Sequence, residues 1–333
     1  MGLLQKIWDG IKGGDSVDMT FVQDVDGNTG APAFVDGETY VELYVQSLRL
    51  RNARKFTQKY DGVVYSFVTL PFQATENVKV PAVSKPNELV QLDPGAISKV
   101  ITFNKQMMGA IPWRGGPMLL ELGLFSVKGD NLLSPVLDFV TEISDAAGIS
   151  FVGKIAPFAP LISKGVDIIA GQTANVALEV GIDTALQVGK PGVHAIIAEP
   201  KDGKLDKTKL SVDPADGKLL YDGQPLKASY CVFSIKGSTQ KSDFGQIPEL
   251  KDKFAAFRAA LQKQVEDDAK EALAAFRVAA LTSPDLIRSD AKRLVALAEQ
   301  MMGDVFGGGQ VSLAPVESLR AAESLDKLPL YAT

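Results

Sequence analysis

Asp-Gly pairs divide much of this chain into short segments, and they constrain its fold more than any other feature of the sequence. Each pair can place a residue at positive φ in a tight turn between two strands. Six of these pairs are Asp26-Gly27, Asp36-Gly37, Asp61-Gly62, Asp202-Gly203, Asp216-Gly217 and Asp222-Gly223. Short strands joined by such turns are typical of an antiparallel sheet and not of a doubly wound parallel sheet.

The segments between these turns contain β-branched and aromatic residues at the density of strands. We predict strands at residues 39–51, 62–70, 78–83, 99–104, 118–128, 175–186, 192–199 and 228–236. In the first of them the apolar alternation through Val41 and Val45 slips by one residue before Leu48. Such a slip predicts a β-bulge within a continuous strand.

Helical periodicity appears in three other parts of the chain. Residues 1–17 predict a short amphipathic helix, and residues 131–170 predict a helical insert in the β-rich part. After residue 237, an apolar stripe from Leu250 to Phe276 predicts one long helix, and Ser283 precedes a second one. The predicted domains are an N-terminal helix at 1–17, a β-rich domain at 18–237, a helical hairpin at 246–306 and a loosely held tail at 307–333.

These elements together predict an α+β protein. Its β-rich part is predicted to be an antiparallel β-sandwich, C2-like by analogy of pattern, with an α-helical insert and a C-terminal helical hairpin. At 333 residues and 46% hydrophobic composition, the chain is long enough for one large core with a smaller appended unit.

The charge balance and the single cysteine restrict partners and compartment. With 35 basic and 40 acidic residues, the net charge of −5 gives no overall attraction for nucleic acid. One cysteine, Cys231, excludes an intrachain disulfide. The first residues also lack the apolar core of a secretory signal, so we expect a cytoplasmic protein without a simple transmembrane helix.

The sequence has little with which to build a catalytic site. His194 is the only histidine, which excludes metal sites that need two imidazoles. No phosphate-binding glycine motif and no nucleophile-elbow motif is present. A dyad between His194 and Cys231 stays open, because strands of one sheet could bring them together. We nevertheless predict that the protein is not an enzyme.

Asp24, Asp26 and Asn28 resemble the first ligands of a calcium loop, because alternate oxygen-bearing side chains can converge on a hard cation. The rest of the loop departs from that pattern, since Thr29 replaces the expected glycine and Val35 the expected acid. The alternative is a polar hairpin turn. We predict no other metal or cofactor.

Two surfaces are candidates for partner contact. Tryptophan and arginine are frequent interface hot spots, which points to Trp113 and Arg114 in a predicted loop at 107–117 and to Trp8 in the N-terminal helix. Trp113 could instead cover the core. A basic cluster predicts contact with an anionic membrane surface or, alternatively, the solvated end of a strand. Its members are Arg49, Arg51, Arg54 and Lys55.

The preferred interpretation is a non-enzymatic binding or adaptor protein that acts through protein–protein contacts, as part of a larger cytoplasmic assembly or as a homo-oligomer. One alternative is a membrane-associating or pore-forming protein that uses residues 149–170 or the N-terminal helix. The other alternative is a Cys-His hydrolase that uses Cys231 and His194.

Overall fold

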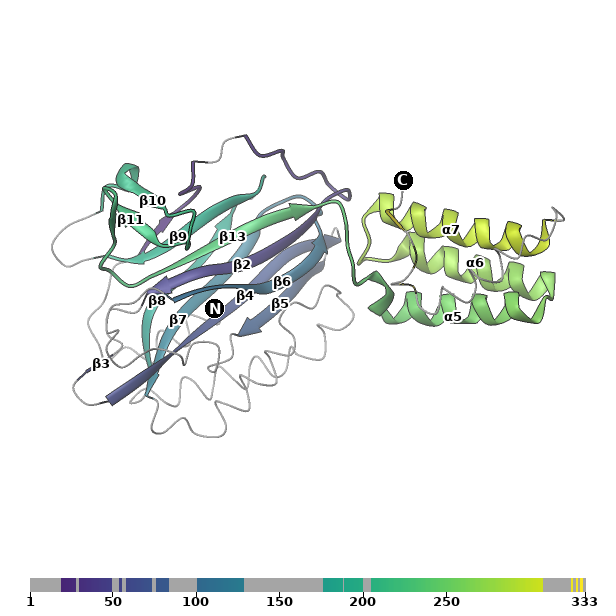
Figure 1. Ribbon diagram of the computed structural model, residues 1–333, viewed down its shortest axis with the longest axis horizontal. Coiled ribbons are helices and arrows are strands. Elements are labelled where there is room, and N and C mark those ends of the chain that lie inside the picture. The colour runs from purple at the N-terminus through teal and green to yellow at the C-terminus, as the bar shows by residue number, and fades with distance from the viewer. Residues whose placement is uncertain are drawn as a thin grey trace.

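The described part of the chain is a mixed α+β structure with antiparallel sheets and three α-helices (Figure 1). The computed structural model describes residues 19–27, 30–49, 54–55, 58–73, 76–83, 101–128, 176–187, 189–199, 205–307, 325, 328 and 330–331. The predicted helices at 1–17 and 131–170 and most of the predicted tail lie outside these residues. In the described residues, no helix is long and apolar enough to cross a membrane.

The first five-stranded sheet has the order β1-β9-β13-β2-β6. Its strands are β1 (Met19–Val22), β9 (Gly192–Ala198), β13 (Tyr230–Ser238), β2 (Tyr40–Arg49) and β6 (Ile101–Pro112). The predicted bulge in β2 is confirmed: Val45 pairs with Phe233 and Ser47 with Val232, so Gln46 is the extra residue. After the bulge Leu48 is again buried in the core.

The second five-stranded sheet is built around the long strand β4 (Gln58–Gln73). Its other strands are β3 (Arg54–Lys55), β5 (Glu76–Val83), β7 (Met118–Lys128) and β8 (Val176–Leu186). The prediction of a turn at Asp61-Gly62 is wrong. Both residues lie inside β4, where Asp61 pairs with Val127 of β7 and Gly62 pairs with Ser126. Pairing along the full length of β7 overrides the local turn preference of Asp-Gly.

Both five-stranded sheets contribute to one hydrophobic core. Val41 and Leu43 of β2 and Phe233 of β13 lie in the same cluster as Val64 of β4 and Leu122 of β7, and all five are fully buried. Alternate residues of each strand therefore face a shared interior, as the strand period requires.

Strand β6 is longer than predicted. We predicted that it ends near residue 104 and that a loop begins at 107, but the strand continues to Pro112, where it pairs with Tyr40. Met107 and Met108 are fully buried and Ile111 almost so. The Met-Met-Gly-Ala sequence has weak strand propensity, so it is the pairing with β2 that extends the strand. Only the turn from Trp113 remains, with Gly115 and Gly116 at positive φ.

A small third sheet covers one end of the first. It has strands β10 (Leu210–Val212), β11 (Leu219–Tyr221) and β12 (Gln224–Pro225), and a 3-10 turn, η4 (Lys207–Lys209), precedes it. Asp222 and Gly223 both have positive φ in the turn between β11 and β12, which confirms the tight turn predicted there. Gly217 and Gly37 also have positive φ, as the Asp-Gly pairs predict.

The C-terminal region contains three helices where a two-helix hairpin was predicted. They are α5 (Pro248–Lys263), α6 (Glu266–Thr282) and α7 (Arg288–Phe306), and the 3-10 turn η5 (Phe244–Gln246) leads into them. The predicted first helix is broken at Gln264, which has φ 56° and ψ 31°. Position 264 is neither a glycine nor a proline, the two residues that usually mark the end of a helix.

The break lets α5 and α6 fold back on each other. Phe254 of α5 and Phe276 of α6 lie with ring centroids 5.3 Å apart in the helical core. Leu325 and Leu330 are buried in the same core. These two residues of the tail are therefore packed against the helices, contrary to the expected loose attachment.

Candidate functional site

A pocket of about 350 Å³ opens beside β1 and β9, at one edge of the first sheet. It contains polar side chains from two segments far apart in the chain, among them Asp24, Lys190 and His194. The remaining lining residues are Gln23, Ala31, Ala33, Gln187 and Gly189. Its volume is in the range of small-molecule sites.

His194 is held in this pocket by its backbone pairing and by one hydrogen bond. It lies in β9 opposite Phe233 and is only 3% exposed. Its Nδ1 accepts a hydrogen bond from the backbone N–H of Asp24 at 3.3 Å. Burial lowers the pKa of His194, because the charged imidazolium loses its hydration, while the nearby carboxylates of Asp24 and Asp26 oppose this shift.

Asp24, the first residue of the predicted calcium site, lies directly beside His194. It has a positive φ of 53°, and its carboxylate lies 3.8 Å from the ammonium of Lys190. Asn28 is outside the described residues. No group of three or more His, Cys, Asp or Glu side chains that could hold a metal ion occurs in the described part of the chain.

Cys231 and His194 lie on adjacent strands but are not opposite each other. Cys231 pairs with Ile196, whereas His194 pairs with Phe233. The thiol is fully buried, and burial raises the pKa of Cys231 to about 12. A nucleophilic cysteine requires a lowered pKa, so this environment favours a structural role for the thiol.

Trp113 and Arg114 lie where the first sheet meets the helices. Trp113 is 6% exposed, belongs to the main core and packs with its ring centroid 5.8 Å from that of Phe34. This burial favours the interpretation that Trp113 covers the core. Arg114 is half-buried and donates a hydrogen bond to the carbonyl of Leu286 at 3.4 Å. Trp8 lies outside the described residues.

The predicted basic surface is not formed as expected at Arg49. This residue is 8% exposed, and its guanidinium donates to the carbonyl of Leu226. Arg51 and the side chains of Arg54 and Lys55 lie outside what the structure describes. Arg49 therefore contacts the segment that follows the small third sheet, and little of its side chain reaches the surface.

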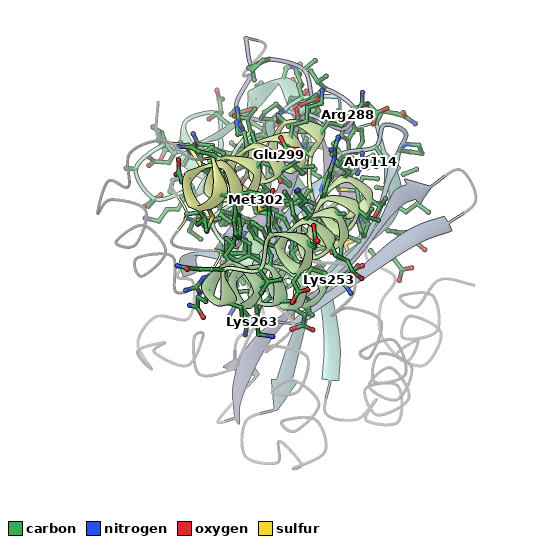
Figure 2. All side chains as sticks on the ribbon, turned by 90° about the vertical axis from the view of Figure 1, so that its right-hand side faces the viewer. Arg114, Lys253, Lys263, Arg288, Glu299 and Met302 are labelled. Atoms are coloured by element: carbon green, nitrogen blue, oxygen red, sulfur yellow. The ribbon has the colours of Figure 1, made fainter. Side chains whose placement is uncertain are left out.

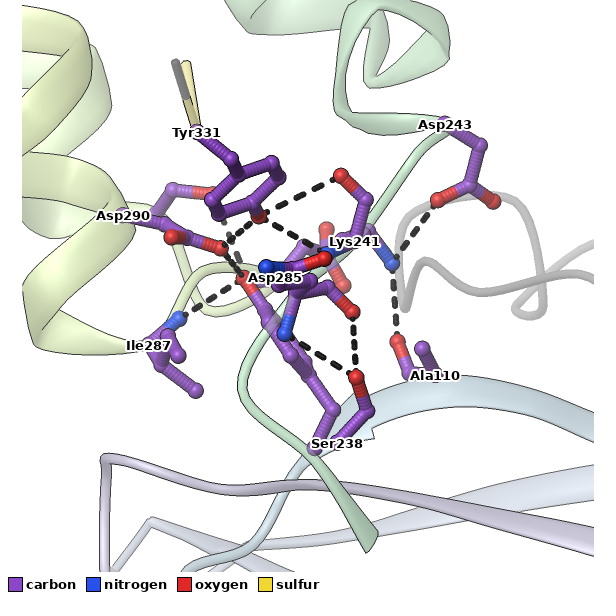
Figure 3. Close-up of polar contacts among 11 residues, drawn as sticks. Ala110, Ser238, Lys241, Asp243, Asp285, Ile287, Asp290 and Tyr331 are labelled. Atoms are coloured by element: carbon purple, nitrogen blue, oxygen red, sulfur yellow. Dashed lines mark hydrogen bonds and ion pairs between the residues drawn. The ribbon is translucent and has the colours of Figure 1, made fainter. Parts of the chain in front are cut away.

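A buried polar cluster joins the first sheet to the helices (Figure 3). Asp290 of α7 is completely buried, and its Oδ2 accepts hydrogen bonds from the hydroxyls of Tyr40 at 2.8 Å and Tyr331 at 2.7 Å. Its Oδ1 accepts from Arg293 at 2.8 Å. The hydroxyl of Tyr40 in turn accepts from the backbone N–H of Ile287 at 3.2 Å. We call Tyr40, Lys241, Asp290 and Tyr331 the junction cluster.

Lys241 supplies the positive charge of the junction cluster. Its side chain is fully buried, and its ammonium donates to the carbonyl of Ala110 at 2.8 Å and lies 3.3 Å from the carboxylate of Asp243. Burial lowers the pKa of Lys241, and the carboxylates of Asp243 and Asp285 oppose the shift. This cluster was not predicted, because its members are far apart in the chain and match no motif.

The outer face of α6 was not predicted either. This helix packs against α5 and α7, and the three helices form the end of the molecule that faces the viewer in Figure 2. Val278 and Leu281 are 62% and 50% exposed, and the neighbouring Ala274 and Ala275 are exposed as well. Their spacing places them along one side of the helix, which we call the α6 face.

No family model, no curated protein sequence and no solved structure matches this chain.

Proposed function

We propose that this protein is a non-enzymatic binding or adaptor protein that acts through protein–protein contacts. The α6 face is the observation that carries the proposal. Its central residues, Val278 and Leu281, are exposed large apolar side chains on a helix whose opposite side is buried. Exposed apolar side chains that lie together favour a partner surface.

The partner that best fits the α6 face is a protein with an apolar helix. Apolar residues at helical spacing are recognised by a second helix through ridges and grooves. Ala274 and Ala275 are small enough to let that helix approach closely. The face has charged neighbours in Lys270 and Arg277, whose side chains are 59% and 58% exposed. This arrangement matches the apolar centre and polar rim of protein interfaces.

The junction cluster supports the same proposal, because it fixes the helices against the sheet. Gly37 belongs to this contact: its carbonyl accepts from the N–H of Arg288 at 2.9 Å, and a Cβ at Gly37 would lie 2.7 Å from the Arg288 side chain. A rigid joint presents the α6 face in one orientation, which reduces the entropy lost on binding.

We assign the β-rich part, residues 18–237, to a C2-like antiparallel β-sandwich, and residues 246–306 to a separate helical unit. Support for the sandwich comes from the single hydrophobic core to which both five-stranded sheets contribute. We place the protein in the cytoplasm, in accordance with its single buried cysteine.

Substitutions on the α6 face test the proposed function. The double variant Val278→Glu with Leu281→Glu adds two negative charges to exposed positions and leaves the helical core unchanged. We expect it to capture the partner from an extract of the native cell about tenfold more weakly than the wild-type protein. Quantitative pull-down gives the comparison, and light scattering after size exclusion shows whether the partner is a second copy of the chain.

Lys253→Glu is the matched control, because it changes the net charge by the same amount at an exposed position of α5. This variant should retain the partner, and circular dichroism should show equal helix content in all three proteins. Equal capture by the wild type and the double variant would refute the proposal. So would a wild-type protein that is monomeric and captures nothing.

A further inference from the structure

The imidazole of His194 has a buried hydrogen-bond donor that meets no acceptor in the described part of the chain. Its Nδ1 accepts the N–H of Asp24, so in the neutral ring the proton is on Nε2. Nε2 is buried and has no hydrogen-bond partner among the residues that the structure describes. Unsatisfied buried donors are rare in native proteins, and a ligand is one explanation for them.

A glycine allows the carboxylate of Asp24 to lie close to this donor. A Cβ at Gly192 would lie 2.4 Å from Oδ1 of Asp24 and 3.5 Å from Nε2 of His194. The absent side chain at Gly192 therefore lets the carboxylate of Asp24 approach the edge of the imidazole. Asp24 and His194 both line the pocket described above.

The protonation of the ring argues against a metal ion in this pocket. A metal needs the lone pair of Nε2, which requires the proton on Nδ1. That tautomer would point an N–H at the N–H of Asp24, and the hydrogen bond from the N–H of Val25 to the carbonyl of Val193 at 2.8 Å holds the two segments together.

The charges of the pocket argue against a small anion as well. Asp24 and Asp26 both act on His194 through their negative charge, whereas Lys190 provides one positive charge in the lining. A hydroxyl group fits this combination, because it can accept from Nε2–H and donate to a carboxylate at the same time. The amides of Gln23 and Gln187 add further donors and acceptors to the wall.

We propose that this pocket binds a small, uncharged polyhydroxyl molecule, a sugar or a polyol, through the Nε2–H of His194 and the carboxylate of Asp24. The pocket volume of about 350 Å³ suits a ligand of this size. The proposal does not depend on the α6 face.

Because His194 is the only histidine, the imidazole signal in ¹⁵N-edited NMR of the protein comes from this ring alone. We expect the shifts of the free protein to show a neutral ring with the proton on Nε2. In titrations with D-glucose, N-acetylglucosamine and myo-inositol, at least one compound should shift this signal in a saturable way. Sodium acetate and calcium chloride should not.

Two variants locate the binding. Gly192→Ala displaces the carboxylate of Asp24 from the edge of the imidazole and should weaken binding by about tenfold or more. Lys190→Met should do the same, because it removes the ammonium that lies 3.8 Å from this carboxylate, and it leaves β9 unchanged. Gly30→Ala is the control, because a Cβ at Gly30 has nothing within 4 Å. Three results would each overturn the proposal: a proton on Nδ1, a saturable shift with calcium or acetate but with none of the three polyols, or no saturable shift with any compound.

Discussion

His194 shows how strongly a folded environment can change the chemistry of one residue. The ring is 3% exposed, and the carboxylates of Asp24 and Asp26 and the ammonium of Lys190 are the charged groups near it. The loss of hydration outweighs the attraction of the carboxylates, so the pKa lies below its ordinary value of 6.5. The folded protein therefore keeps this ring neutral at a pH where the unfolded chain would protonate it.

This shift predicts that His194 destabilises the protein in mild acid. Below its ordinary pKa the unfolded state binds more protons than the folded state, so the free energy of unfolding falls as the pH falls. The contribution is at most about 1.4 kcal/mol per pH unit. Urea unfolding of the wild type and of His194→Gln between about pH 7 and 5 checks it. The stability difference between the two proteins should change with pH in this range. A constant difference would contradict the lowered pKa.

At the scale of elements, the chain between α5 and α6 determines the shape of the helical region. Gln264 adopts the left-handed conformation, which is unfavourable for a residue with a Cβ. Gln264→Gly should therefore raise the free energy of unfolding by about 1 kcal/mol, measured by urea denaturation.

Gln262→Gly provides the comparison, because Gln262 is an exposed residue within α5. Glycine there should lower the free energy of unfolding, by up to about 1 kcal/mol. If both glycine variants were destabilised equally, the helix would continue through Gln264 and the two-helix prediction would be restored.

At the scale of the whole molecule, the junction cluster should make the sheets and helices unfold together. Asp290 accepts hydrogen bonds from Tyr40 of β2 and from Tyr331, so Asp290→Ala leaves one buried and one partly buried hydroxyl without this acceptor. We expect a loss of about 1–3 kcal/mol and a separation of the two unfolding transitions. In a Trp8→Phe background, fluorescence of Trp113, the only remaining tryptophan, reports on the sheet, and far-UV circular dichroism reports mainly on the helices.

Asp304→Ala is the matched control, because Asp304 is an exposed residue of the same helix. Its two transitions should coincide, as in the wild type. Coincident transitions in Asp290→Ala as well would show that the junction cluster does not couple the two parts.

The sequence by itself determined eight of the strands, most of their boundaries, several Asp-Gly turns and the bulge at Gln46, but not β1, β3 or the strands of the small third sheet. These features follow from side-chain period and local backbone preference, which act over a few residues. Asp61-Gly62 and Gln264 show the limit of such reasoning, since pairing and packing with distant segments decided both.

Only the tertiary structure decided the candidate sites. It buried Trp113 and Arg49 and placed Asp24 beside His194, although these two residues are 170 positions apart. It also gathered Tyr40, Lys241, Asp290 and Tyr331 into one buried cluster. Burial and electrostatic interaction depend on distances in space, and a single sequence without a motif carries no local signal for them.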